Sequence, residues 1–174
     1  MNGAMTLRLA EDAVLPYRVA ELAKELQAAV GGLDHSLRRE LAKHNISLDW
    51  LKKETVKFQQ QAKSFESWLK ANKKIDKPTR RWVNERLMLV ERAFIKREGL
   101  LGRANVRNMA FGTDPEDAFA GKALAFMHEH AYHARKIKDT RKAASAWEEA
   151  HMDLSRLVLA VRMGAQLLDM KRTI

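Results

Sequence analysis

The 174-residue sequence contains no cysteine, only three prolines and eight glycines. The lack of cysteine excludes disulfide bonds, thiol catalysis and thiolate metal sites. So few prolines and glycines argue against a β-sandwich or β-barrel, whose many turns use both residues. No run of about 18 apolar residues is present, so no transmembrane helix is predicted. We therefore expect this segment itself to be soluble.

The charge balance is strongly basic. There are 32 Lys and Arg residues against 22 Asp and Glu residues, which gives a formal net charge of +10. Most of the excess lies between residues 33 and 82. A basic protein favours anionic partners such as nucleic acid or an acidic lipid surface. Because the lysines are spread through helical repeats without interleaved aromatic residues, we favour a solubilising surface and keep nucleic-acid or other anionic-surface binding as the alternative function.

Apolar residues recur at steps of three and four along nearly the whole chain. This period is typical of amphipathic helices, which are predicted over residues 19–30, 33–41, 51–69, 83–94, 119–134 and 144–168. No strand pattern competes with it, apart from a short extended piece at residues 5–9. The fold class is therefore predicted to be all-α, a bundle of about four long helices plus short helices.

Several residues predict where these helices begin and end. Gly31 and Gly32 are expected to end the first helix in a left-handed conformation. Ser47 is expected to cap the helix that follows it, and Asp76 with Pro78 to begin the next one. Between residues 99 and 117 the period stops. That stretch keeps apolar residues among its glycines, so we expect an ordered irregular segment with a functional role.

A histidine cluster is the strongest candidate for a metal site. His128, His130 and His133 lie within the run HEHAYH, and His130 and His133 would share one helix face. With Glu129 they could hold a transition metal. The zinc-protease pattern H-E-x-x-H fails, however, because Tyr132 occupies the position of its second histidine. We therefore favour surface or interface histidines, predict no metal and no cofactor, and leave the role of the cluster open.

Other catalytic or ligand-binding motifs are weak. The sequence has no G-x-S-x-G elbow, no Walker loop and no G-x-G-x-x-G run. Gly99 and Gly102 form a G-x-x-G like that of a KH domain, but the strands that such a module needs are not predicted. The four tryptophans, on separate amphipathic helices, are interpreted as core and helix-interface packing and not as a stacking platform. No catalytic residue is predicted.

Residues 84–111 read NERLMLVERAFIKREGLLGRANVRNMAF. This run resembles the signature of the transferrin receptor-like dimerisation domain, the C-terminal helical part of glutamate carboxypeptidase-type proteins and transferrin receptors. The positions that fit the family pattern are Asn84, Leu87, Met88, Glu91, Arg92, Ala93, Phe94, Gly99, Leu100, Gly102, Arg103, Arg107 and Asn108. Softer matches at residues 7–17, 45–51 and 118–126, the last including Phe119 and Gly121, extend the resemblance over almost the whole chain.

The resemblance implies a single all-α domain, residues 1–174, for dimerisation and interdomain packing. The family's two-zinc site belongs to a preceding peptidase domain, so the resemblance implies no catalysis by this segment. We expect an excised domain in which residues 1–4 are either a cloning remnant or a native start. The implied partners are a second copy, forming a homodimer, and the peptidase-like domain of the parent chain. By analogy the parent is a membrane-anchored protein with this domain outside the cytoplasm.

The sequence also departs from the family pattern. The family's prolines after Leu100 and Arg103 are replaced by Leu101 and Ala104, so we expect a less constrained loop. In the carboxypeptidases a Lys-Tyr pair recognises the terminal glutamate of the substrate. The matching positions here are Ala118 and Phe119, so the resemblance does not carry that recognition role over.

The charged residues of the signature are expected to hold the irregular segment. Arg103 and Arg107 carry planar guanidinium groups that can bind loop carbonyls or a neighbouring carboxylate. Glu91 and Arg92 are expected to pair with charges of the same segment. This role and a role in an interface are compatible, and the sequence does not separate them.

Overall fold

The computed structural model describes Leu7 and residues 11–117 and 119–170. This part of the chain is mostly helical, with six α-helices and one short two-stranded hairpin. The elements in order are α2 (Val19–Gly31), α3 (His35–Lys43), α4 (Asp49–Ala71), α5 (Lys77–Ala93), β1 (Phe111–Thr113), β2 (Gly121–Ala123), α6 (Ala125–Lys136) and α7 (Thr140–Leu167). The predicted all-α bundle is confirmed, with the hairpin as an addition.

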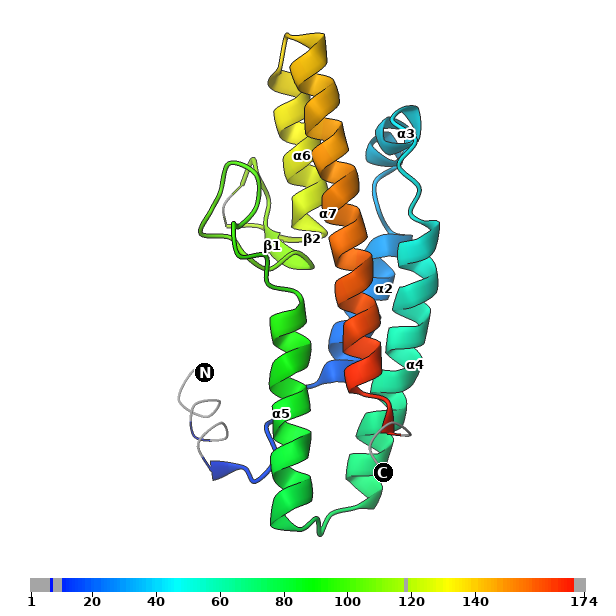
Figure 1. Cartoon of the computed structure of the whole chain (residues 1–174), viewed down its shortest axis with the longest axis vertical. Helices are drawn as coiled ribbons and strands as arrows, with labels where there is room; N and C mark the ends of the chain where they lie inside the picture. Colours follow the sequence, from blue (N-terminus) through cyan, green and yellow to red (C-terminus); the bar gives the residue numbers. More distant parts are fainter. Residues whose placement is uncertain (1–6, 8–10, 118, 171–174) are drawn as a thin grey trace.

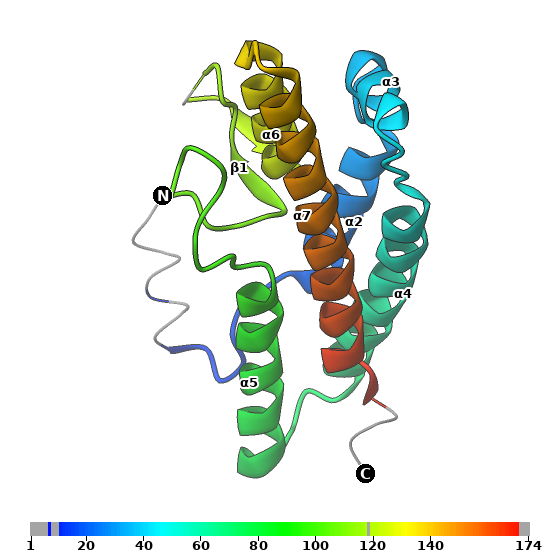
Figure 2. The ribbon, with the colours of Figure 1, turned by 45° about the horizontal axis from the view of Figure 1, so that its top comes forward.

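Helix α7 is the central element of the bundle. It runs down the middle of the molecule, with α4 and α5 on either side of its lower half and α6 beside its upper half (Figures 1 and 2). Its packing partners are α4, α6 and α5, while α2 packs mainly on α4. The hairpin lies beside α6, above the end of α5 (Figure 1). The bundle therefore has two ends, formed by the α4–α5 turn and the α6–α7 turn.

One continuous apolar core joins the helices. Its largest fully buried side chains include Phe58, Phe65, Phe94 and Phe126. The rings of Phe58 and Phe94 lie 6.1 Å apart between centroids, which links α4 to the end of α5. Each such side chain contributes about 1.5–3 kcal/mol when it is fully buried. At Gly164 of α7 a Cβ atom would come within 3.1 Å of the Phe58 ring, so the small residue lets α4 and α7 approach closely.

Aspartate side chains cap the starts of three helices. At the start of α3, Asp34 accepts hydrogen bonds from the backbone N–H groups of Ser36 and Leu37. At the start of α7, Asp139 accepts from those of Arg141 and Lys142. Asp76 accepts from the Thr79 N–H at 3.0 Å, with Pro78 in the first turn of α5, as the sequence predicted. These bonds satisfy donors that have no partner within the helix.

Two of the predicted helix ends differ in detail. Helix α4 begins with Leu48 at the cap position, and Ser47 lies one residue earlier, where its Oγ accepts from the Asp49 N–H at 3.1 Å. Gly32 follows α2 but has φ of −94°, so the predicted left-handed glycine cap is wrong. The Arg38 guanidinium supplies the reason, because it donates to the carbonyl groups of Gly31 and Val30 at 2.6 and 3.0 Å.

The hairpin overturns two other expectations. The segment predicted to be irregular contains β1, which pairs antiparallel with β2 through Phe111↔Ala123 and Thr113↔Gly121. The helix expected from residue 119 begins only at Ala125, because Leu124 has a left-handed φ of 54°. Of the extended piece at residues 5–9, only Leu7 lies among the described residues, and residues 1–4 lie outside them.

Candidate functional site: the loop and hairpin around α6

Residues 95–110, which lie between α5 and β1, form a loop that we call the signature loop. Backbone hydrogen bonds hold this loop in one conformation. The Lys96 N–H donates to the Arg107 carbonyl at 2.8 Å, and the Leu100 N–H donates to the Val106 carbonyl at 2.8 Å. The loop is fastened to its neighbours as well, since the Met109 N–H donates to the Phe94 carbonyl at 2.9 Å. The segment is therefore ordered, as expected, and it forms a rigid platform between α5 and the hairpin.

Two glycines make this loop possible. Gly99 and Gly102 have φ angles of 76° and 75°, in the left-handed region that disfavours other residues. A Cβ atom at Gly99 would lie 2.4 Å from the Ala104 carbonyl oxygen, and one at Gly102 would lie 2.5 Å from Nε2 of His133. Both conformation and space therefore require glycine at these two signature positions.

Arg103 joins the loop to the hairpin and to α6. Its guanidinium donates to Oγ1 of Thr113 at 2.7 Å and to the Thr113 carbonyl at 2.9 Å. It also forms an ion pair with Glu129, a buried carboxylate on α6. The other oxygen of Glu129 lies 3.3 Å from Nε2 of His133. Charged groups thus replace apolar packing at this junction, and each buried charge has an opposite partner.

A second buried carboxylate, Asp153 of α7, was not singled out in the sequence. It accepts from Nζ of Lys96 at 2.6 Å and from Arg156 at 2.7 Å, and Nε2 of His130 lies 3.0 Å away. Burial alone would raise the pKa of Asp153, but the hydrogen bonds from His130, Lys96 and Arg156 outweigh it and hold this pKa well below its ordinary value. One carboxylate therefore ties together α6, α7 and the residues that follow α5.

The three histidines of HEHAYH contact different groups. His130 is buried against Asp153, His133 lies against Glu129 and Gly102, and His128 lines a pocket on the other side of α6. The structure therefore does not bring them together. No group of three or more His, Asp or Glu side chains that could hold a metal ion occurs within residues 11–117 and 119–170.

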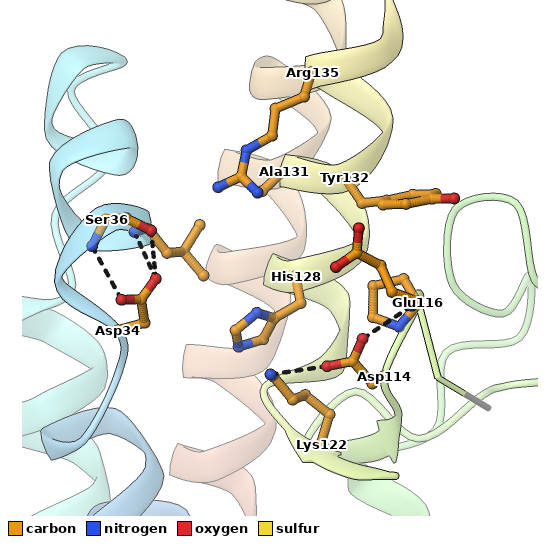
Figure 3. A pocket seen from close by; sticks show the side chains of 11 residues that line it. Asp34, Ser36, Asp114, Glu116, Lys122, His128, Ala131, Tyr132 and Arg135 are labelled. Carbon is orange, nitrogen blue, oxygen red and sulfur yellow. Dashed lines mark hydrogen bonds and ion pairs between the residues drawn. The ribbon is translucent and has the colours of Figure 1, made fainter. Parts of the chain in front are cut away.

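That pocket, of about 230 Å³, lies between the start of α3, the hairpin and α6 (Figure 3). His128 points into it between Asp34 and Lys122. Nζ of Lys122, on β2, lies 2.8 Å from Oδ2 of Asp114, which follows β1. Burial lowers the pKa of His128, and Lys122 adds to the effect, while Asp114 and Asp34 oppose it. The pocket is polar, and its charges largely neutralise one another.

Hydrogen bonds from Ser36 and Leu37 hold the pKa of Asp34 at about 2, well below its ordinary value. Hydrogen bonds from Lys122 and the Glu116 N–H likewise lower the pKa of Asp114. Both carboxylates are therefore ionised at neutral pH. Asp34 caps helix α3, and Asp114 forms an ion pair with Lys122 across the hairpin. Both roles are structural.

The signature residues of α5 divide between two faces. Leu87 is buried, as is Phe94 just after the helix, whereas Met88, Glu91 and Arg92 face outward. The predicted pairing of Glu91 and Arg92 with the loop is wrong, because neither has an ion pair within the described residues. Both side chains are exposed, and Lys96 and Arg103 make the ion pairs with buried carboxylates instead.

Asn84, at the start of the signature, fastens the segment that precedes α2. Its Oδ1 accepts from the Leu15 N–H at 2.9 Å, and its Nδ2 donates to the Ala13 carbonyl at 3.1 Å. One amide side chain therefore bonds two points of this segment to α5.

The remaining candidates lie in and near the hairpin. Oδ1 of Asn108 accepts from the N–H groups of Ala110 and Phe111, which shapes the entry into β1. Arg107 is exposed, and its guanidinium has no hydrogen bond within the described residues. Phe119 is fully exposed between the strands, and Gly121 begins β2. Ala118 lies outside the described residues.

Exposed apolar side chains form a stripe on α7. Met152, Leu159 and Met163 are 52%, 54% and 47% exposed. Their spacings of seven and four residues place them on one helix face. The buried face of α7, with Leu154, Leu157 and Val161, points the other way. We call these three residues the α7 stripe.

The tryptophans only partly match the predicted packing role. Trp147 is buried and stacks on the His44 ring with centroids 4.5 Å apart. Trp68 and Trp82 are half-buried against the core. Trp50 is 61% exposed at the start of α4, so the core interpretation is wrong for this residue.

Comparison with known proteins identifies the class. The model of the transferrin receptor-like dimerisation domain matches residues 46–169, so the chain belongs to this family and the predicted family is confirmed. The chain is 29% identical to aminopeptidase NAALADL1 of Mus musculus over 170 residues, which cover 95% of this chain and 22% of that protein. It is 26% identical to the probable glutamate carboxypeptidase LAMP1 of Arabidopsis thaliana over 166 residues, covering 95% and 23%.

The chain thus spans less than a quarter of the length of these relatives. None of the helices in the described part of the chain is both long and apolar enough to cross a membrane.

Proposed function

We propose that this chain is a non-catalytic helical module that holds two copies of its parent protein together and packs against a peptidase-like domain. Membership in the dimerisation-domain family carries the proposal. The structural support is that apolar side chains remain exposed on several elements, among them the α7 stripe and the tip of the hairpin. Exposed apolar patches on a folded domain commonly mark contacts with other proteins.

The α7 stripe is the surface that we assign to the second copy. Three half-exposed side chains in a row can be buried by an equivalent stripe in a two-fold symmetric pair.

The hairpin tip is the surface that we assign to the peptidase-like domain. Phe119 is fully exposed there, and Glu116 and Asp117 next to it are exposed acidic residues. Arg103 and Asn108 fasten the base of the hairpin through hydrogen bonds to Thr113 and Ala110, so the strand that leads to the tip is held in place. Pre-organisation of this kind lowers the entropy cost of binding.

The buried polar groups support a structural role. Glu129 and Asp153 are both paired with cations that arrive from the signature loop or from the residues after α5. These ion pairs orient the hairpin and α6 relative to α7, which is the task of a packing module. We assign no acid–base or nucleophilic role to them.

Light scattering after size exclusion, over a concentration series at two salt levels, tests the proposal. We expect a species of twice 19.9 kDa that is insensitive to salt. Leu159→Glu places a charge in the α7 stripe and should give a monomer with unchanged helical circular dichroism. Leu89→Glu, at a similarly exposed apolar position on α5, is the matched control and should stay dimeric. A wild-type monomer at every concentration would refute dimerisation by this chain alone.

A further inference from the structure

The turn between α4 and α5 carries a dense group of basic residues. Residues 70–81 contain a single acidic residue, Asp76, and six cationic ones, namely Lys70, Lys73, Lys74, Lys77, Arg80 and Arg81. Asp76 is engaged as the cap of α5. The turn forms one end of the elongated molecule (Figure 1, bottom). Its charge is therefore presented outward, at the opposite end of α5 from the hairpin.

Most of these cations have no anionic partner. Within the described residues, only Arg81 of the six forms an ion pair, with Glu85 at 2.9 Å. Lys73, Lys74 and Lys77 are exposed and follow one another closely around the turn. Like charges at such short separations repel, and a bound polyanion would relieve that repulsion.

Two hollows adjoin the turn, and Arg80 lines both. One, of about 360 Å³, has an apolar floor that includes Leu69 and Ile75, with Lys73 at its edge. The other, of about 480 Å³, is lined by Lys77, Arg80 and Arg81, together with Asn84, Met88 and Glu85, the ion-pair partner of Arg81. Cations from the turn and from the first turns of α5 therefore surround common spaces into which an anionic group can fit.

We propose that this basic end binds clustered phosphate groups, presented either by the headgroups of an anionic lipid surface or by a small polyphosphorylated molecule. Lys and Arg side chains are the usual phosphate ligands, and several close together favour a multivalent anion. Single-stranded nucleic acid fits less well, because its bases commonly stack on exposed aromatic side chains. Residues 70–81 contain no aromatic residue, and the exposed Trp50 lies at the other end of α4.

The opposite end of the bundle offers a matched control. Residues 135–142, around the α6–α7 turn, are also rich in cations. There Arg135 is bound to Glu40 and Lys136 to Tyr132. Lys138, Arg141 and Lys142 are exposed. Replacing these three by Glu changes the net charge as much as the triple variant Lys73→Glu, Lys74→Glu and Lys77→Glu does, but leaves the α4–α5 turn intact.

The experiment measures sedimentation of the whole chain with phosphatidylcholine vesicles that contain about one-fifth phosphatidylserine, and calorimetric titration with inositol hexakisphosphate. We expect wild-type protein to bind at least one of the two probes, with an affinity that falls as salt is added. The α4–α5 triple variant should bind about tenfold more weakly, and the α6–α7 control within about twofold of wild type. Arg80→Gln provides a milder variant if the triple one does not fold.

The outcomes separate the sources of phosphate. Binding to the vesicles alone supports lipid headgroups, whereas binding to both probes or to the hexakisphosphate alone supports a compact phosphate cluster. No binding to either probe overturns the proposal, and so does equal weakening by both triple variants. Tighter binding to mixed-sequence duplex DNA than to either probe would also overturn it in favour of a nucleic-acid site. None of these results depends on whether the protein dimerises through α7.

Discussion

The Nε2 atom of His130 lies 3.0 Å from Oδ2 of Asp153, and both side chains are almost completely buried where α6 packs on α7. Lys96 reaches the same carboxylate oxygen from the loop that follows α5. The contact joins three parts of the chain by charge in a core that is otherwise apolar. It therefore determines how the signature loop sits on the helices, in addition to stabilising them.

Removing this carboxylate should destabilise the protein strongly. Asp153→Ala leaves the mostly buried Lys96 ammonium without its counter-charge, and breaking a buried pair in this way costs about 3–5 kcal/mol. Urea unfolding followed by circular dichroism measures the loss. Glu91→Gln, at an exposed position without an ion pair in the described part of the chain, should change the unfolding free energy by less than about 0.5 kcal/mol. A loss below about 1 kcal/mol for Asp153→Ala would contradict the assigned role.

Replacement by alanine should destabilise the protein at one glycine and have almost no effect at another. Gly102→Ala combines a positive φ with a clash against His133, so we expect a loss of at least about 1–3 kcal/mol. Gly121→Ala meets open space without a positive φ and should be nearly neutral. Thermal melts of both variants test the pair. His133→Ala in the Gly102→Ala background should recover part of the loss, since it removes the clash but not the backbone strain. No recovery would mean that His133 does not crowd this position.

Stability should fall as the pH drops below about 6.5. Burial lowers the pKa of His128 from the ordinary value of 6.5, so below that pH the unfolded chain binds a proton that the folded chain resists. The unfolding free energy therefore decreases as the pH falls from about 6.5 to the lower pKa of folded His128. Above pH 6.5 His128 is neutral in both states and does not change the unfolding free energy. Urea titrations between pH 5 and 8 should show this slope in the wild type. His128→Gln should reduce it, and an unchanged slope would assign it to another group.

A separate loss is expected at acid pH. Because the folded pKa of Asp153 is depressed, its contribution is complete above the ordinary value of 3.8 and is lost as the pH falls further towards the folded pKa. Acid titration followed by circular dichroism should therefore show that Asp153→Asn lacks part of this transition. If the variant and the wild type have the same acid transition, Asp153 is not the group responsible.

Exposed apolar side chains should bind a hydrophobic dye. Phe119→Ser removes one exposed apolar side chain without touching the core, so dye fluorescence should fall while the melting temperature changes little. Val90→Ser, in the core, is the contrasting variant and should lower the melting temperature and raise dye binding. Wild-type protein with no excess dye binding would contradict an exposed hairpin tip.

Local signals in the sequence predicted most of the helical framework. The spacing of the apolar residues, together with Asp76 and Pro78, located α5 to within a few residues. The hairpin was not predicted, because three-residue strands are too short to show an alternating pattern and β1 lies in a glycine-containing segment. The late start of α6 depends on the left-handed Leu124, a conformation that this residue type does not indicate.

The candidate site was predicted less completely, because its contacts join distant residues. Arg103 was singled out, but its partner Thr113 was not, and Glu129 was considered only as a possible metal ligand. A signal was present at Asp153, since it follows the apolar face that contains Ala150, Leu154 and Leu157. An acidic residue on such a face indicates a buried ion pair, yet nothing in the sequence identifies a lysine 57 positions away as the partner.

Helix α7 carries the interior of the bundle on one side and the α7 stripe on the other. Its ten buried residues and the three of the stripe share one helix, so folding and assembly depend on the same backbone. If two copies associate through this helix, mass action couples the two processes, and the melting temperature will rise with protein concentration.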